Sequence, residues 1–123
     1  MNFKEKEKFL YLITDTSSLL FFSASGLIVA DENQKNINLL ITKSNNNNLI
    51  AYKKIKTSQI NYDTHTNRDE EFPRVLLEIK SDIVDYFEST PIEVQKFKTN
   101  DGQIYFEIPF IPIHYLNRII FDS

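Results

Sequence analysis

The chain has no cysteine and only two glycines among its 123 residues, and each shortage excludes a kind of chemistry. Without cysteine there are no disulfides, no thiolate metal sites and no cysteine nucleophile. Two glycines are too few for the glycine-rich loops with which Walker and dinucleotide-binding motifs hold phosphate groups. No apolar run approaches the roughly 20 residues that a helix needs to cross a bilayer, so we expect no membrane-spanning helix.

The chain also lacks a strong charge of either sign. Its formal net charge is −3, and lysines outnumber arginines by 11 to 3. This balance creates no global field that favours nucleic acid or an anionic membrane, so such binding must come from a local patch. Residues 1–8 carry charge where a signal peptide needs an apolar segment, and we therefore expect a cytoplasmic protein.

Length and composition indicate one domain that spans residues 1–123. Apolar residues make up 41% of the chain and charged residues 25%, a balance typical of globular proteins. The hydrophobic patterns predict strands at 9–14, 27–29, 39–42, 49–52, 74–80, 92–98, 103–110 and 119–121, and helices at 19–25, 82–87 and 113–118. Because these helices are few and irregularly placed, we predict an α+β fold with a mainly antiparallel or mixed sheet and one or two covering helices.

Capping and turn residues mark the ends of several of these elements. Residues 15–18 are expected to cap the first helix, Gly26 to end it, and Ser81 to cap the helix at 82–87. Residues 45–48, four asparagines in a row, predict a turn because asparagine tolerates left-handed backbone. Residues 99–102 contain Asn-Asp-Gly, which favours a tight β-hairpin between the flanking strands.

Side chains alternate between two faces along the second arm of this hairpin. The apolar set, which we expect to face the core, is Ile104, Phe106, Ile108 and Phe110. The opposite set is Gln103, Tyr105, Glu107 and Pro109. The pattern therefore predicts that Glu107 points outward, beside Tyr105.

Two segments resemble ADP-ribosyltransferases of the DarT type, which modify DNA bases using NAD. The first comprises Tyr-Leu-Ile-Thr at 11–14, a helix and then Gly-Leu-Ile at 26–28, and the second is the glutamate-led strand and proline-started turn at 107–119. The resemblance implies an ADP-ribosyltransferase-like fold and NAD as cofactor. It also implies that Tyr11 and Thr14 lie on the nicotinamide side of a cleft, and that Glu107 is catalytic because it polarises the ribose or activates the acceptor.

Two departures from the family pattern argue against transfer activity. Leu12 stands where the family has a histidine that holds the NAD ribose, and the segment after Gly26 lacks the arginine that would grip the pyrophosphate. Because leucine cannot donate a hydrogen bond, NAD would lose a contact worth about 1 kcal/mol. We therefore expect a degenerate relative, without a bound cofactor, that acts as a binding module in a toxin, defence or anti-defence setting. In the alternative interpretation, Tyr11 is a strand residue, Thr14 belongs to a helix cap and Glu107 is an exposed carboxylate.

A second alternative is a Mg²⁺-dependent nuclease. Glu78 and Lys80 lie two residues apart and therefore on one side of a strand, and Asp63 or Asp69 would complete a Mg²⁺ site. In such a site the carboxylates hold the metal and the lysine stabilises developing negative charge. His65 lies near these acids, but one histidine without a recognised ligand spacing does not indicate a zinc site.

A third alternative is an interaction domain unrelated to transferases. Tyr52 precedes Lys53, Lys54 and Lys56 in a segment that combines basic residues with an adjacent aromatic ring. The lysines would contact phosphates while the ring stacks on a base, although lysines on a strand also serve to protect a sheet edge. The 16 aromatic residues equally favour a protein partner, because some of them would remain exposed.

Overall fold

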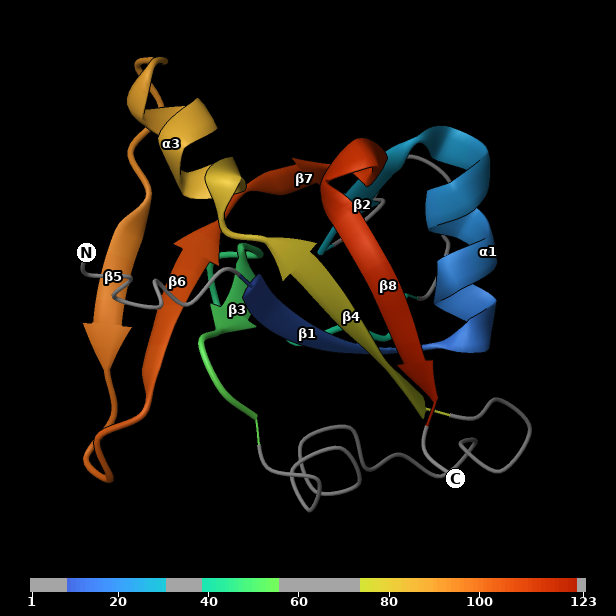
Figure 1. Cartoon of the computed structure of the whole chain (residues 1–123), viewed down its shortest axis with the longest axis horizontal. Helices are drawn as coiled ribbons and strands as arrows, with labels where there is room; N and C mark the ends of the chain where they lie inside the picture. Colours follow the sequence, from blue (N-terminus) through green and yellow to red (C-terminus); the bar gives the residue numbers. More distant parts are fainter. Residues whose placement is uncertain (1–8, 31–38, 56–73, 122–123) are drawn as a thin grey trace, which may run out of the picture.

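The computed structural model describes residues 9–30, 39–55 and 74–121, and Figure 1 shows how their elements are arranged. The strands are β1 (Phe9–Asp15), β2 (Leu27–Val29), β3 (Leu49–Tyr52), β4 (Arg74–Lys80), β5 (Gln95–Lys98), β6 (Ile104–Ile108), β7 (Phe110–Pro112) and β8 (Leu116–Phe121). The helices are α1 (Thr16–Ser25), α3 (Asp82–Glu88) and the short 3₁₀ helix η2 (Ile113–Tyr115). Within the described residues, no helix has both the length and the apolar character needed to span a membrane.

The predicted α+β class is confirmed. Six strands form one sheet in the order β5-β6-β3-β1-β4-β8, and β2 pairs with β7 in a smaller sheet. All of the strand pairs in the described part of the chain are antiparallel. The two α-helices lie on the side of the large sheet that also carries β2 and β7, as Figure 1 shows.

The main core lies between the large sheet and this covering layer. Alternate residues of β1, β3, β4 and β6 point into it, and the covering elements supply Phe22, Ile28, Ile83, Phe87 and Ile111. We call this side of the large sheet the inner face and the opposite side the outer face. Burial of one leucine or phenylalanine side chain contributes about 1.5–3 kcal/mol, so the covering layer is held mainly by its apolar contacts.

The strand predicted at 74–80 is confirmed as β4, an interior strand between β1 and β8. Its seven residues pair with all seven residues of β1. Six residues of β4 are buried, since its inner-face residues enter the main core. On the outer face Leu76 and Ile13 form a smaller buried cluster with Tyr11, Ile55 and Ile120.

The predicted end of α1 is confirmed, but the helix begins at Thr16, three residues earlier than predicted, because Asp15 already caps it. Asp15 has an extended backbone, and its carboxylate accepts a 2.8 Å hydrogen bond from the Ser18 amide. Gly26 takes the left-handed conformation at φ 80°, and its amide donates to the Phe22 carbonyl. An acidic N-cap and a left-handed glycine after the last turn satisfy backbone groups that the helix itself leaves unpaired.

The predicted cap of the second helix is wrong in its chemistry. Ser81 occupies the position before α3, but its side chain makes no capping hydrogen bond. Its backbone is already helical, with φ −64° and ψ −12°. A capping side chain normally leaves from an extended residue, so the Ser81 hydroxyl is not placed over the free amides of the first turn.

Both predicted turns are confirmed. At 99–102 the Gly102 amide donates to the Thr99 carbonyl, and Gly102 takes φ 86°. This is a β-turn followed by a left-handed glycine, a common three-residue hairpin loop. At 45–48 Asn47 takes φ 60°, and the Ser44 amide donates to the Asn48 carbonyl.

The segment before the asparagine turn at 45–48 differs from the prediction. Residues 39–42 do not form a strand, and Ile41 makes only an isolated bridge to Thr14. Instead the Thr42 hydroxyl accepts from the Ile13 amide and donates to the Ile50 carbonyl, so it bridges β1 and β3 where they diverge.

The helix predicted at 113–118 extends only from Ile113 to Tyr115. The residues that follow pair with β4 as part of β8, which overrides their local helical preference. The arm predicted at 103–110 is likewise divided into β6 and β7, and Pro109 stands between them. Proline cannot donate to a strand ladder, which explains why the pairing changes at this point.

Candidate functional site

One residue from each strand of the large sheet contributes to a row across the outer face. Tyr11 lies opposite both Tyr52 and Glu78, and the neighbouring pairs extend this alignment to both edges. From β5 to β8 this outer row consists of Phe97, Tyr105, Tyr52, Tyr11, Glu78 and Arg118. The row is aromatic toward β5 and charged toward β8, so its two ends offer different chemistry.

The aromatic end consists of three rings in contact. Phe97 stacks on Tyr105 with ring centroids 5.2 Å apart and planes at 17°, and Tyr52 lies 5.6 Å from Tyr105 at 55°. All three side chains are partly exposed. Cross-strand aromatic pairs contribute about 0.2–1 kcal/mol each, so the sheet holds these rings in place before any ligand arrives.

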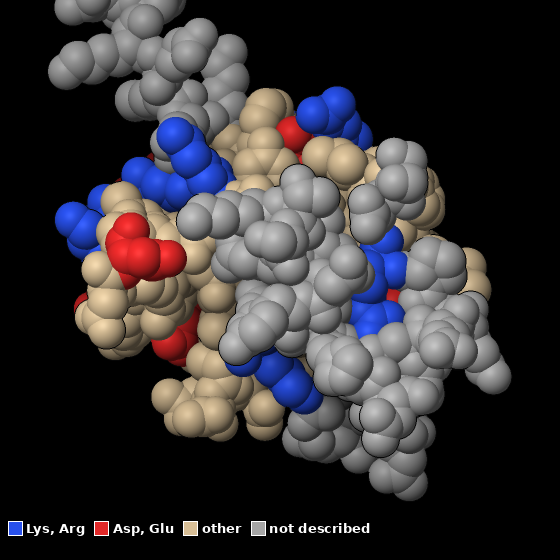
Figure 2. All heavy atoms as spheres, turned by 90° about the horizontal axis from the view of Figure 1, so that it is seen from below, with Lys and Arg blue, Asp and Glu red and all other residues tan. Residues whose placement is uncertain are grey.

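Two basic residues, Lys53 and Lys54, follow Tyr52 directly in the sequence. Lys53 is half-buried and Lys54 is exposed, and the Gln103 side chain donates a 2.9 Å hydrogen bond to the Lys54 carbonyl. Lys56, which belongs to the same predicted patch, lies outside the described residues. Figure 2 shows basic side chains in several separate groups with acidic ones between them, so the positive charge is local.

A hollow of about 390 Å³ adjoins Tyr52. Ile50 and Tyr52 of β3 form one wall, and Ile41, Thr42 and Lys43 form the other. Lys43 is exposed at its margin. The hollow therefore places an apolar wall, a hydroxyl and a cation beside the aromatic end of the outer row.

The charged end is built around the buried carboxylate of Glu78. The Tyr11 hydroxyl donates to its Oε1 at 3.0 Å, and Asn117 Nδ2 and Arg118 Nε each donate to its Oε2 at 2.8 Å. The Glu78 side chain is 3% exposed, whereas that of Arg118 is 65% exposed. A buried carboxylate thus has hydrogen bonds to both oxygens, and its counter-ion reaches into solvent.

A bulge in β8 makes this arrangement possible. Glu78 pairs with Arg118 and Ile79 pairs with Leu116, so Asn117 is the extra residue. Consecutive residues of a regular strand point to opposite faces, yet Asn117 and Arg118 both contact Glu78. Bulges commonly redirect a side chain beside a functional site, which makes this end of the row a candidate.

The contacts at Glu78 set the ionisation of the pair that it forms with Tyr11. Burial raises the pKa of Glu78, but the hydrogen bonds from Asn117, Arg118 and Tyr11 outweigh this effect and leave the pKa below its ordinary value of 4.5. Burial, together with the neighbouring carboxylate, raises the pKa of Tyr11 above 10.0, although Arg118 opposes the rise. At neutral pH Glu78 is therefore a carboxylate and Tyr11 a neutral donor.

The structure does not bring together the three residues that the transferase resemblance singles out. Tyr11 and Glu107 lie on the outer face, with β3 between their strands. Thr14 is completely buried, and its hydroxyl donates a 2.5 Å hydrogen bond to the Leu40 carbonyl. Glu107 is half-buried and accepts a long 3.5 Å contact from the Asn48 side chain.

The proposed nuclease residues also differ from one another in their surroundings. Oε2 of Glu78 accepts two hydrogen bonds and Oε1 accepts one, so a metal ion would compete with these donors for a side chain that is 3% exposed. Lys80 is exposed at the end of β4, while Asp63, Asp69 and the nearby His65 lie outside the described residues. Within the described ranges, no group of three or more acidic or histidine side chains is placed to hold a metal.

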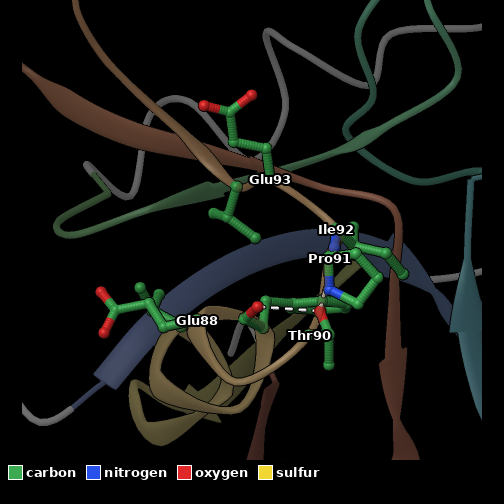
Figure 3. A pocket seen from close by; sticks show the side chains of 8 residues that line it. Glu88, Thr90, Pro91, Ile92 and Glu93 are labelled. Atoms are coloured by element: carbon green, nitrogen blue, oxygen red, sulfur yellow. Dashed lines mark hydrogen bonds between the residues drawn. The ribbon is translucent and has the colours of Figure 1, made fainter.

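A second hollow, of about 280 Å³, lies between the end of α3 and the segment that leads to β5. Its lining includes Glu88, Thr90, Ile92 and Glu93. Figure 3 shows that the two carboxylates extend in different directions. They therefore do not converge on a common ligand.

Several residues of the outer row could not be recognised from the sequence. The predicted hairpin at 99–102 pairs the arm that carries Phe97 with the arm that carries Tyr105, but nothing local predicts that Tyr52 would lie on the other side of Tyr105. Asn117 and Arg118 fall in a segment predicted to be helical, and their role depends on the bulge opposite Glu78. Comparisons of the chain with protein-family models, curated proteins and solved structures found no match.

Proposed function

We propose that this domain binds single-stranded nucleic acid on the outer face of its large sheet. The observation that carries the proposal is the contact row of Phe97, Tyr105 and Tyr52, which presents three partly exposed rings on adjacent strands. Base stacking on an aromatic side chain is worth about 1–3 kcal/mol per base and tolerates any sequence. A preformed set of rings on an antiparallel sheet is the arrangement that such stacking uses.

The surroundings of the rings support this ligand. Lys54 is exposed beside them, and Lys43 stands at the margin of the adjoining hollow, so cations are available for backbone phosphates. A single strand fits better than a duplex, because stacking on the rings needs bases that are not already stacked between neighbours in a helix.

Because the net charge of the chain is small, we also expect binding to depend only weakly on salt concentration. With a net charge of −3 and few cations near the rings, stacking supplies more of the binding free energy than phosphate neutralisation does. Each neutralised phosphate adds about −0.7 to the slope of log affinity against log salt for a single strand. We therefore expect a slope no steeper than about −2.

The transferase hypothesis remains a separate prediction, as does a toxin or defence setting. Tyr11 and Glu107 share the outer face, but Thr14 lies on the other side of β1. NAD-dependent labelling of DNA or protein that is lost in Glu107→Ala would establish the transferase activity. We place binding first because the ring contacts support it directly.

The proposal is tested by fluorescence anisotropy with a labelled ten-nucleotide oligothymidylate and the matching oligouridylate. We expect Tyr105→Leu to weaken binding about tenfold, since it removes the central ring from the row. Tyr86→Leu is the matched control, because Tyr86 is an exposed tyrosine on α3 outside the row and its replacement leaves the three rings intact.

Two results would contradict the proposal. One is no change in anisotropy up to about 0.1 mM protein, the weak end of the range of non-specific nucleic-acid binding. The other is equal weakening by Tyr105→Leu and Tyr86→Leu, which would show that the rings of the outer row have no special part in binding.

A further inference from the structure

Stability alone does not explain the buried carboxylate of Glu78, near the β8 end of the outer row. Transfer of a charged side chain into a protein interior costs several kcal/mol, and well-packed apolar residues in place of a buried ion pair are often neutral or stabilising. Here the chain also departs from regular strand geometry so that Asn117 and Arg118 both reach Glu78. An arrangement of this kind fixes the orientation of a side chain.

Arg118 is the side chain whose orientation is fixed. It uses only its Nε to reach Glu78, and its side chain is 65% exposed. Within the described residues, no hydrogen bond involves the two terminal amino groups of Arg118. Those groups form a rigid planar fork that matches two oxygens of a phosphate, and a guanidinium held at Nε loses less freedom when the fork binds.

We propose that Glu78 positions Arg118 as a binding group for a phosphate at the β8 end of the outer row. That this phosphate belongs to a nucleic-acid strand rests on the proposed function. Arg118 lies four strand spacings from Tyr105, about 19 Å. A stacked strand has one phosphate per about 3.4 Å, so a strand of about six nucleotides covers the distance from the rings to the arginine.

Because Glu78 is negatively charged, the interaction of Arg118 with a phosphate depends on the direction of its hydrogen bonds more than on its charge. A carboxylate 2.8 Å from Nε offsets most of the positive charge of Arg118, so simple attraction contributes little. The geometry of the fork then carries the interaction, and a lysine of the same charge would not replace it. For the same reason, loss of the negative charge at Glu78 should weaken phosphate binding, because the arginine loses its orientation.

The first test compares variants in the binding of the ten-nucleotide oligothymidylate. Arg118→Lys keeps the charge and is expected to weaken binding about tenfold or more, as one charge-assisted hydrogen bond is lost. Glu78→Gln is expected to weaken it by a similar factor, although it removes a negative charge. A purely electrostatic role predicts the opposite sign for Glu78→Gln, and stronger binding by that variant would overturn the inference.

The length of the probe supplies an internal control. A dinucleotide on the rings is too short to reach Arg118, so Arg118→Lys should bind it as the wild-type protein does, whereas Tyr105→Leu should still bind it more weakly. If Arg118→Lys binds the ten-nucleotide probe as tightly as the wild-type protein, the phosphate role is overturned and the stacking proposal stands.

A titration with inorganic pyrophosphate separates the two proposals completely. The Nε–Hε signal of Arg118 in an NMR spectrum should shift on addition of pyrophosphate, and the shift should be lost in Glu78→Gln. A shift in a protein that fails to bind oligonucleotides would support the phosphate site without the proposed function. An unmoved Arg118 signal at about 20 mM pyrophosphate, well above the roughly 0.1 mM weak end of non-specific nucleic-acid binding, would overturn the site.

Discussion

Replacement of Glu78 by glutamine should lower the free energy of unfolding near neutral pH, and this loss should be smaller at acidic pH. The substitution keeps the volume of the side chain but removes the charge that three donors share. The glutamine oxygen can still accept from Asn117 and Arg118, but its NH₂ group then faces the Tyr11 hydroxyl, which has to change from donor to acceptor.

Three terms decide the magnitude. A hydrogen bond to a charged group contributes about 1.5–3 kcal/mol, and those from Tyr11 and Asn117 are the more protected ones. The ion pair to Arg118 contributes no more than about 1 kcal/mol, because that side chain is 65% exposed. The variant also avoids the desolvation cost of the buried charge, which offsets several kcal/mol of this loss. The expected net loss in the free energy of unfolding is about 1–3 kcal/mol.

The pH dependence follows from the lowered pKa of Glu78 in the folded protein. A carboxyl whose pKa is lower in the folded state stabilises that state above its unfolded pKa, which lies near 4.5. The contribution disappears as the pH falls through the lower, folded value. The difference between Glu78→Gln and the wild-type protein should thus be constant above about pH 6 and shrink below about pH 4.5.

The assay is urea unfolding followed by circular dichroism between pH 7 and pH 3. Glu107→Gln is the control, because within the part of the chain that the structure describes this half-buried glutamate has only a long contact from Asn48, and its replacement should change stability by less than about 0.5 kcal/mol. A difference for Glu78→Gln that stays constant across the whole pH range would refute the reasoning. So would a variant more stable than the wild-type protein at pH 7.

Three further predictions concern single contacts. Tyr11→Phe removes one donor to the Glu78 carboxylate, so it should cost about 1.5–3 kcal/mol in urea unfolding and raise the pKa of Glu78 in an NMR titration; an unchanged pKa would contradict the described contact. Asp15→Ala removes the N-cap of α1 and should cost about 1 kcal/mol, whereas a loss below about 0.3 kcal/mol would show that the cap is unimportant. Gly102→Ala should cost about 1 kcal/mol from backbone strain alone, since no atom lies within 4 Å of the added Cβ, and an equally stable variant would contradict the left-handed turn.

The elements that could be predicted from the sequence are those set by local chemistry. Residues 99–102 carry the glycine that the hairpin loop needs, and Gly26 ends α1 in the same left-handed conformation. The buried strand at 74–80 is recognisable because its apolar run is bounded by Pro73 and Ser81. In each case the signal lies within a few residues of the feature that it predicts.

The candidate site could be predicted only in part, because it depends on register between distant strands. The patch at Tyr52 and Lys54 was visible, and so was the outward face of Tyr105. Their contact with one another depends on the pairing of β3 with β6, which no local pattern specifies. Thr14 failed to join Tyr11 for a simple reason: residues three apart on a strand point to opposite faces.

The charged end of the row was beyond sequence reasoning for a different reason. Asn117 and Arg118 have no local feature that indicates a bulge, and the preceding proline favours a helical start. Pairing with β4 decides their conformation, and Glu78 lies about 40 residues earlier in the chain. The sequence singles out this glutamate through its spacing to Lys80, and not through these partners.

The most direct test of the central claim is an NMR titration of the ¹⁵N-labelled protein with the ten-nucleotide oligothymidylate. The outer-face account predicts that the largest shifts fall on the backbone amides of Tyr52, Phe97 and Tyr105, with little change around the exposed Leu20 of α1. Shifts centred on α1, or no shifts at all, would contradict it.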